Sequence, residues 1–255
     1  MSALCRDRGG GIRALAGRLC TILCRCVPSL QRRGRTVNRH LLFHDLIAAL
    51  ETGACPVCQL TAVATERRLR ALFHESVNDP GVRAELRASL GFCRRHGQQA
   101  LSMGDPLGVA ILYAATLAEA RRRLELAKLR GRFPPRAGCP LCETEMLDSD
   151  HYVEGLAAAL QDPQMQARYA DQTAGGLCIH HMERVLAVAC RHVAAFLCDR
   201  EGERLAGLAH EMGEFIRKQH HEFAHEPLGE ERDAVRRAVQ KAAGVGTALD
   251  EERLR

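Results

Sequence analysis

A short cysteine motif occurs twice in this chain and is followed each time by a second motif. CPVC at 55–58 precedes CRRH at 93–96, and CPLC at 139–142 precedes CIHH at 178–181. Equivalent positions of the two sets are 84 or 85 residues apart. Recurrence of whole motifs in the same order is typical of an internal duplication. The sequence therefore predicts two similar halves, each with one CPxC and one CxxH.

Each half offers three thiols and one imidazole, the donor set that zinc binds in a tetrahedron. Residues three apart at a helix start share a face, and the positive end of the helix dipole favours the thiolate. We expect two zinc ions in closed, structural Cys3His sites, each built within one half. The predicted ligands are Cys55, Cys58, Cys93 and His96 in the first half and Cys139, Cys142, Cys178 and His181 in the second. His180 is an alternative ligand, although only His181 keeps the register of His96.

The composition favours an all-α fold. Aromatic residues make up only 4% of the chain and tryptophan is absent, whereas Ala, Leu, Arg and Glu are abundant. These four residue types favour helices over strands. The fold class that we predict is all-α, with two tandem helical repeats, each held by a CPxC…CxxH metal site.

Proline, glycine and apolar spacing divide the chain into helices and larger parts. Pro after Cys55 or Cys139 suits the first helical position and makes each cysteine an N-cap. The predicted helices cover 38–50, 56–77, 80–90, 93–103, 106–130, 139–160, a short stretch from 163, 178–197, 203–223 and 230–243. The predicted parts are a basic, disordered leader at 1–37, modules at 38–132 and 139–226, and a short C-terminal helix and tail at 227–255.

The charge is unevenly distributed. Residues 1–40 hold nine Arg and one Asp, which is +8, so a total of +5 leaves −3 for the rest. We therefore expect no clear nucleic-acid or membrane binding by the body of the protein. The leader could also be translated sequence upstream of the true start, or a weak basic amphipathic helix at 12–27.

Cysteine usage bears on the compartment. The apolar stretch at 12–30 is interrupted by arginines and does not read as a signal peptide, and no run approaches the length of a membrane span. We expect a cytoplasmic protein, in which spaced cysteines more often bind metal than form disulfides.

Three other interpretations of the cysteines remain open. CPxC resembles the dithiol of thioredoxin-like redox proteins, but the βαβ pattern of that fold is missing. Three cysteines and one histidine can also hold an iron–sulfur cluster. The thiols could instead pack in a core without binding metal.

A separate motif matches a zinc-protease signature. His221-Glu222-Phe223-Ala224-His225 fits HExxH, in which two histidines on one helical face bind zinc and the glutamate is the base. Pro227 follows two residues after the second histidine, and the surroundings are rich in His and Glu. A metalloprotease at 221–225 is therefore a minor alternative.

The chain resembles a family of uncharacterised bacterial proteins with duplicated CPxC…CxxH motifs, a domain of unknown function. The resemblance covers about 38–245 and is carried by CPVC, CPLC, GFCRRH, GLCIHH, LGVAILYAATL at 107–117 and EPLGEE at 226–231. It implies a bacterial source and a helical fold, and no activity. This chain has KQHH at 218–221 where the family shows a Lys-x-Asp-like segment, which favours a chance origin for HExxH.

From these patterns we expect a non-enzymatic zinc-binding protein with a protein partner. The alternative from another class is a cysteine-based redox, iron–sulfur or metal-transfer protein.

Overall fold

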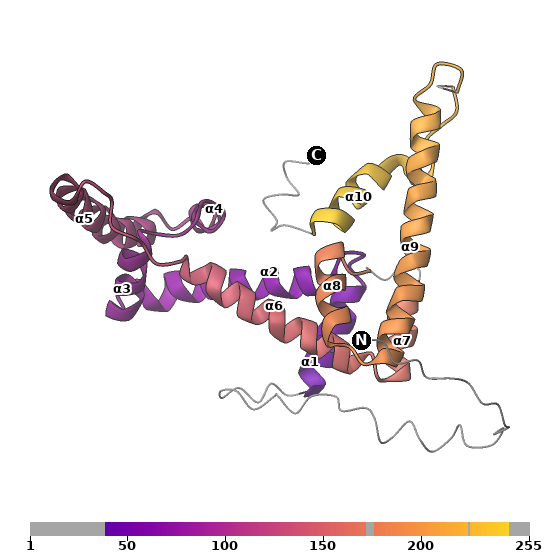
Figure 1. The fold of residues 1–255 in the computed structure, drawn as a ribbon, viewed down its shortest axis with the longest axis horizontal. Coiled ribbons are helices and arrows are strands. Elements are labelled where there is room, and N and C mark those ends of the chain that lie inside the picture. Colours follow the sequence, from indigo (N-terminus) through magenta and orange to yellow (C-terminus); the bar gives the residue numbers. More distant parts are fainter. Residues whose placement is uncertain (1–38, 172–175, 224, 245–255) are drawn as a thin grey trace, which may run out of the picture. The chain divides into compact units, whose positions relative to one another are not determined.

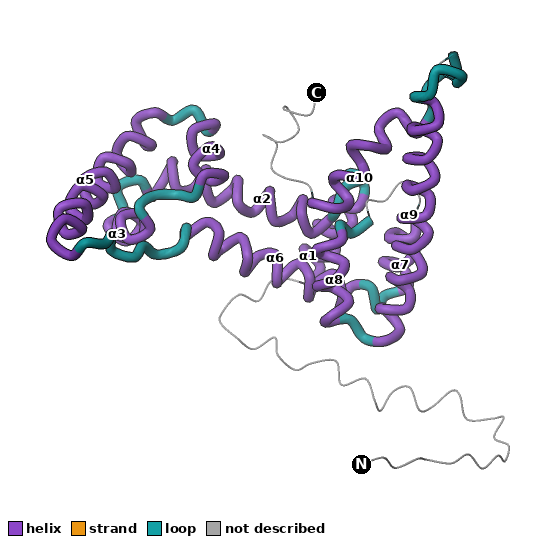
Figure 2. The backbone as a smooth tube through the Cα atoms, turned by 45° about the horizontal axis from the view of Figure 1, so that its top comes forward, coloured by secondary structure: helices purple, strands orange, loops and turns teal. Residues whose placement is uncertain are grey.

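The computed structural model describes residues 39–171, 176–223 and 225–244, and all regular structure in these ranges is helical (Figures 1 and 2). The elements in chain order are α1 Arg39–Leu50, α2 Pro56–Ala71, the π-helix η1 Leu72–Ser76, α3 Pro80–Ser89, α4 Arg94–Ser102, α5 Pro106–Arg130, α6 Pro140–Ala159, α7 Pro163–Ala170, α8 Ile179–Val188, α9 Arg191–Lys218, the 3-10 helix η2 Glu230–Asp233 and α10 Ala234–Ala243. The all-α prediction is confirmed. The predicted leader at 1–37 lies outside the described residues.

The starts of the helices follow the local chemistry of the sequence. Proline occupies the first position of α2, α3, α5, α6 and α7, where its missing N–H costs no hydrogen bond. The carboxylates of Asp79 and Asp105 each accept a hydrogen bond of 2.9 Å from the backbone N–H three residues on. Asp162 caps α7 in the same manner through the N–H of Gln164, at 2.8 Å.

Helices α2 and α6 form the centre of the fold and run antiparallel, side by side (Figures 1 and 2). Val57 at the start of α2 shares a hydrophobic cluster with Val153 near the end of α6. Leu69 near the end of α2 shares another with Leu141 at the start of α6. The start of each helix therefore lies beside the end of the other.

The two halves of the sequence have matching elements. Helices α2, α3, α4 and α5 correspond to α6, α7, α8 and α9 by the 84-residue and 85-residue offsets. The antiparallel pairing of α2 with α6 relates the halves by an approximate two-fold axis across the middle of this helix pair. Most of the buried apolar side chains gather at the α1, α7 and α8 end of the pair.

One predicted helix boundary in the second half was wrong. The helix expected over 178–197 ends at Val188, and α9 is then continuous from Arg191 to Lys218. Cys190 has an extended backbone and is the N-cap of α9. The 85-residue offset aligns Cys190 with Asp105, the N-cap of α5. The start of α9 could therefore have been predicted from the internal duplication.

The C-terminal helix is attached to α9 through a buried carboxylate. The Glu201 side chain accepts hydrogen bonds from the hydroxyl of Tyr169, at 2.5 Å, and from Arg204, at 2.9 Å. It also pairs with Lys241 of α10. Glu201 is almost fully buried, and these partners supply the compensation that a buried charge requires.

Among the described residues, every helix is too short or too polar to cross a lipid bilayer.

Candidate metal centres

The predicted ligands occupy equivalent positions at the starts of four helices. Cys55, Cys93, Cys139 and Cys178 are the N-caps of α2, α4, α6 and α8, and all four have extended backbones. The second ligand of each pair lies three residues later, on the first helical turn. This spacing directs both side chains of a pair to one side of the helix start, as in a capping box.

Four of these side chains form cluster A, which consists of Cys55, Cys58, Cys178 and His181. The Nδ1 atom of His181 lies 3.5 Å from the sulfur of Cys55 and 3.2 Å from the sulfurs of Cys58 and Cys178. The sulfurs of Cys58 and Cys178 are 3.8 Å apart. All four residues are buried.

The other four form cluster B, which consists of Cys93, His96, Cys139 and Cys142. The Nδ1 atom of His96 lies 3.4 Å from the sulfurs of Cys93 and Cys142 and 3.6 Å from that of Cys139. The sulfurs of Cys93 and Cys142 are 3.6 Å apart. His96 is fully buried, whereas the three cysteines are only half-buried.

The eight residues therefore gather in two sets of four, but the predicted grouping within each half was wrong. In cluster A, the CPxC of the first half meets the CxxH of the second half. In cluster B, the CPxC of the second half meets the CxxH of the first half. The antiparallel pairing of α2 with α6 accounts for the exchange, because the start of each helix lies beside the end of the other. Cys93 lies at the far end of α2, where α6 begins with Cys139 and Cys142.

The distances in both clusters fit one tetrahedral ion. A zinc ion bound at about 2.3 Å to sulfur and about 2.0 Å to nitrogen separates its ligand atoms by roughly 3.8 Å for two sulfurs and roughly 3.5 Å for sulfur and nitrogen. The observed separations are 3.6 and 3.8 Å between sulfurs, and 3.2 to 3.6 Å between sulfur and nitrogen. The ligands of an iron–sulfur cluster bind different iron atoms around a larger core. Both clusters thus suit a single ion better than an iron–sulfur cluster.

Comparison with known proteins places the chain in a family. The family described as "Family of unknown function (DUF6062)" matches twice, over residues 45–135 and 134–248. The chain belongs to this family. The two matches coincide with the two repeats, so the predicted duplication and the resemblance to an uncharacterised family are confirmed.

Other comparisons give little about function. The chain is 27% identical over 144 residues to an uncharacterized 23.9 kDa protein in the xynA 3' region of Caldicellulosiruptor sp. (strain Rt8B.4). The alignment covers 55% of this chain and 70% of that protein. A search of the solved structures gave no significant match.

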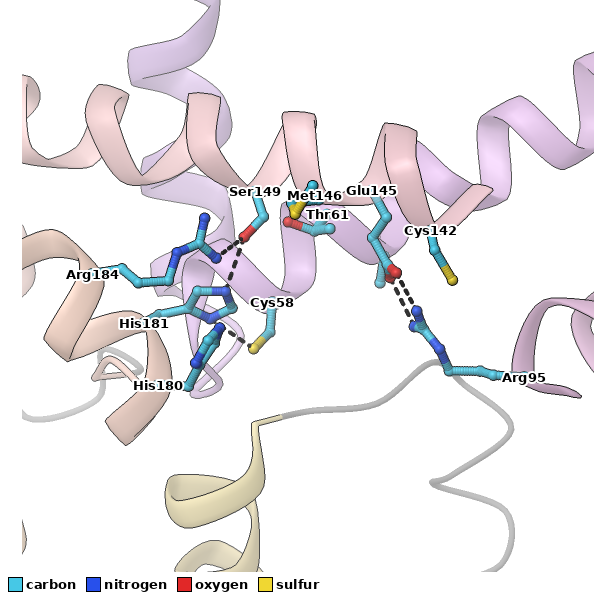
Figure 3. A pocket seen from close by; sticks show the side chains of 11 residues that line it. Cys58, Thr61, Arg95, Cys142, Glu145, Met146, Ser149, His180, His181 and Arg184 are labelled. Atoms are coloured by element: carbon cyan, nitrogen blue, oxygen red, sulfur yellow. Dashed lines mark hydrogen bonds and ion pairs between the residues drawn. The ribbon is translucent and has the colours of Figure 1, made fainter. Parts of the chain in front are cut away.

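The ring of His181 is held by a hydrogen-bond chain on its far side (Figure 3). Its Nε2 lies 3.1 Å from the hydroxyl oxygen of Ser149 on α6. That oxygen also accepts a hydrogen bond of 2.7 Å from Arg184, which pairs with Asp150. An Nε2–H donated to Ser149 leaves the lone pair of Nδ1 facing the three sulfurs, the tautomer that a metal ligand needs.

The ring of His96 has a different neighbour. Its buried Nε2 lies 3.5 Å from a carboxylate oxygen of Glu145 and has no hydrogen-bond partner among the described residues. Glu145 pairs with Arg95 (Figure 3). Sequence reasoning missed both Ser149 and Glu145. Neither residue belongs to the repeated motifs, so no signal in the sequence marked them.

The pKa values in cluster A show the effect of crowding three thiols around one imidazole. Hydrogen bonds with Cys178 and Cys55, together with burial, raise the pKa of Cys58. Hydrogen bonds from Cys55 and Cys58 lower the pKa of Cys178. Burial lowers the pKa of His181, but hydrogen bonds with Cys178 and Cys55 outweigh it and raise the pKa to about 9. Crowding thus shifts the pKa values of Cys58 and Cys178 in opposite directions, and metal binding would release the protons that remain on the ligands.

Cluster B shows the same conflict among its thiols. Burial and the hydrogen bond with Cys93 raise the pKa of Cys142 to about 12. Burial opposes ionisation of Cys93, but hydrogen bonds from the backbone N–H of His96 and from Cys142 lower its pKa overall. A divalent cation removes this conflict because it stabilises all three thiolates at once.

The remaining candidates lie outside both clusters. His180 is exposed, and its ring lies 5.1 Å, centroid to centroid, from that of His181. The HExxH match follows the end of α9, and its described residues lie in turns. The two histidines therefore do not share a helical face, and the metalloprotease alternative loses the geometry on which it depends.

A pocket of about 270 Å³ lies between the two clusters (Figure 3). Its lining includes equivalent residues of the two repeats, such as Cys58 with Cys142 and Arg95 with His180. The pocket therefore lies on the approximate two-fold axis. Its arginines already pair with Glu145 and with Asp150, so they neutralise charge around the clusters.

Proposed function

We propose that this protein is a non-enzymatic zinc-binding protein whose two Cys3His sites are structural. The observation that supports the proposal is the exchange of ligands: each cluster takes one motif from each repeat. A bound ion would therefore tie the two repeats to each other at both ends of the α2–α6 pair.

Zinc is the metal that we propose because of the donor set and the spacing. Three thiolates and one imidazole at tetrahedral distances form a common structural zinc site. Since the protein fills all four positions, no site remains for water or a substrate. The ion would supply stability here, as in other small zinc-stabilised folds.

We propose further that the linked repeats act as a rigid scaffold for a protein partner in the cytoplasm of a bacterium. Two of the three hydrophobic cores include ligand residues: Cys55, Cys58 and Cys178 belong to one, and Cys139 packs against another. Ions at the two clusters would thus hold the geometry of any binding surface on the helices of the two repeats.

Cluster B carries a second candidate function, metal transfer or thiol redox chemistry. Its three cysteines are half-buried, whereas those of cluster A are buried. Exchange of a metal with another protein, or attack on an external disulfide, requires such access. A half-buried position therefore favours cluster B over cluster A for this alternative.

Metal analysis of the purified protein tests the main proposal. We expect two zinc ions for each chain and a colourless solution. A brown protein with iron and sulfide would contradict the zinc assignment and support the iron–sulfur alternative.

Alkylation with iodoacetamide, followed by mass spectrometry, distinguishes structural zinc sites from a metal-transfer or redox function at cluster B. If the sites are structural, cluster A and cluster B remain unmodified in the zinc-loaded protein, while the exposed Cys198 is modified. Rapid modification of Cys93 or Cys142 with loss of one zinc would favour metal transfer or redox chemistry at cluster B.

A further inference from the structure

Helix α5 exposes a row of residues with the spacing of a coiled coil. Six exposed positions follow one another at alternating intervals of three and four residues: Leu107, Ala110, Ala114, Leu117, Arg121 and Leu124. We call this row the α5 seam. Its three leucines are 69%, 66% and 54% exposed. An a/d pattern of this kind is the face that a helix turns toward a partner helix.

The opposite face of α5 already serves the fold. Gly108, Leu112 and Thr116 are buried, one turn apart, and Leu112 packs with Val77 and Leu86 of the neighbouring elements. On a helix of 3.6 residues per turn, this buried row lies about 180° from the seam. The seam leucines therefore make no contribution to the core of the described structure.

The second repeat shows that the fold does not need these leucines. Helix α9 corresponds to α5 with an offset of 85, and its buried Val193, Leu197 and Glu201 match Gly108, Leu112 and Thr116. The α9 positions equivalent to the seam are His192, Ala195, Asp199, Gly202, Ala206 and Ala209. The three leucines of the seam are thus specific to one copy of a duplicated helix, which points to a role outside folding.

The order of large and small residues along the seam makes it complementary to itself. When a second seam runs antiparallel, with Leu107 opposite Leu124 of the other chain, Ala110 lies opposite Arg121, and Ala114 lies opposite Leu117. Each alanine then faces a larger side chain, and the leucines at both ends face each other. The parallel arrangement would instead place Arg121 against its own copy. The paired length is about 26 Å for 18 residues.

We propose that the α5 seam is a dimerisation surface, occupied by the same helix of a second copy of this chain in an antiparallel, two-fold arrangement. A surface that pairs with itself in this way gives a closed dimer. The proposal does not depend on the metal bound in either cluster.

Sedimentation velocity of the full chain in its metal-loaded form tests the surface. The wild type is expected to approach twice the chain mass with increasing concentration. Leu117→Glu, at the middle of the seam, should remain monomeric. Leu129→Glu is the matched control, because Leu129 is 84% exposed on the same helix but lies off the seam; it should dimerise like the wild type. A monomeric wild type, or a dimer that survives Leu117→Glu, overturns the proposal.

A charge exchange tests the antiparallel register. Leu107→Glu and Leu124→Lys should each weaken the dimer. The double variant should regain it, because each glutamate then faces a lysine of the other chain. Failure of the double variant to dimerise, while helix content and zinc content stay at wild-type level, would overturn the antiparallel arrangement.

Discussion

The sulfurs of Cys58 and Cys178 lie 3.8 Å apart although 120 residues separate them in the chain. They belong to different repeats, and the same is true of Cys93 and Cys142 in the other cluster. A structural ion in either place would join two halves that a gene duplication first made as separate copies. Each ion should therefore stabilise both repeats, and loss of either ion should destabilise both.

Removal of metal should destabilise both repeats together. A strong chelator at neutral pH is expected to lower the melting temperature and to broaden or abolish cooperative unfolding, because each ion contributes to folding free energy. Circular dichroism during heating, with and without chelator, provides the measurement. Re-addition of zinc should restore the transition, and an unchanged transition after proven loss of metal would contradict a structural role.

Gly244 is expected to be intolerant of a side chain. It has a φ of +84°, and a Cβ atom built on it would lie 3.1 Å from the sulfur of Cys58. Gly244→Ala should cost about 1–2 kcal/mol of stability through backbone strain, and more if cluster A is displaced.

The matched control is Gly202→Ala. Gly202 lies inside α9, and a Cβ atom there would meet nothing within 4 Å. This change should stabilise the helix by about 0.5–1 kcal/mol. Denaturant unfolding and zinc analysis of both variants provide the measurement. A loss of stability in Gly244→Ala with zinc retained indicates local strain, whereas loss of one zinc ion indicates displacement of cluster A.

The buried Glu201 should be required for docking of α10. Glu201→Gln leaves Lys241 and Arg204 without their carboxylate, so we expect a loss of roughly 3 kcal/mol. The exposed pair of Glu203 and Arg200 on the same helix provides the control, and Glu203→Gln should cost less than about 1 kcal/mol. Equal losses of unfolding free energy in the two variants would show that the buried ion pairs contribute no more stability than the exposed pair.

Acid should weaken the segment around Glu231. The hydrogen bond from Lys218, and those from the backbone N–H groups of Gly229 and Glu231, lower the pKa of Glu231 from 4.5 to about 2. Because the folded-state pKa is the lower one, this stabilisation is present above pH 4.5 and is lost as the pH falls toward 2. The difference in unfolding free energy between wild type and Glu231→Gln should therefore shrink over this range. A difference that stays constant would contradict the assignment.

Local features of the structure followed from the sequence, and the tertiary pairing did not. Pro56 and Pro140 fixed two helix starts and made Cys55 and Cys139 N-caps, because these preferences act within one turn. The eight clustered side chains were also identified from their spacing. Which pair meets which depends on how α2 packs against α6, and that is a property of the whole fold.

The missing information was the antiparallel packing of α2 against α6. This packing brings Cys93 beside the start of α6 and Cys178 beside the start of α2. The orientation of the rings was not predicted, because Ser149 and Glu145 lie on α6 beyond the CPLC motif and approach the two rings only in the folded structure. The seam of α5 became visible only when exposure was known for each of its residues.

The zinc content of two double variants tests the exchange of ligands most directly. Cys58→Ser with Cys178→Ser removes two ligands of cluster A only, so one zinc ion should remain. Cys58→Ser with Cys93→Ser removes one ligand from each cluster, so both ions should be weakened or lost. The opposite result, with one ion retained by Cys58→Ser with Cys93→Ser and none by Cys58→Ser with Cys178→Ser, would show that each site is built within a single repeat and would contradict this account.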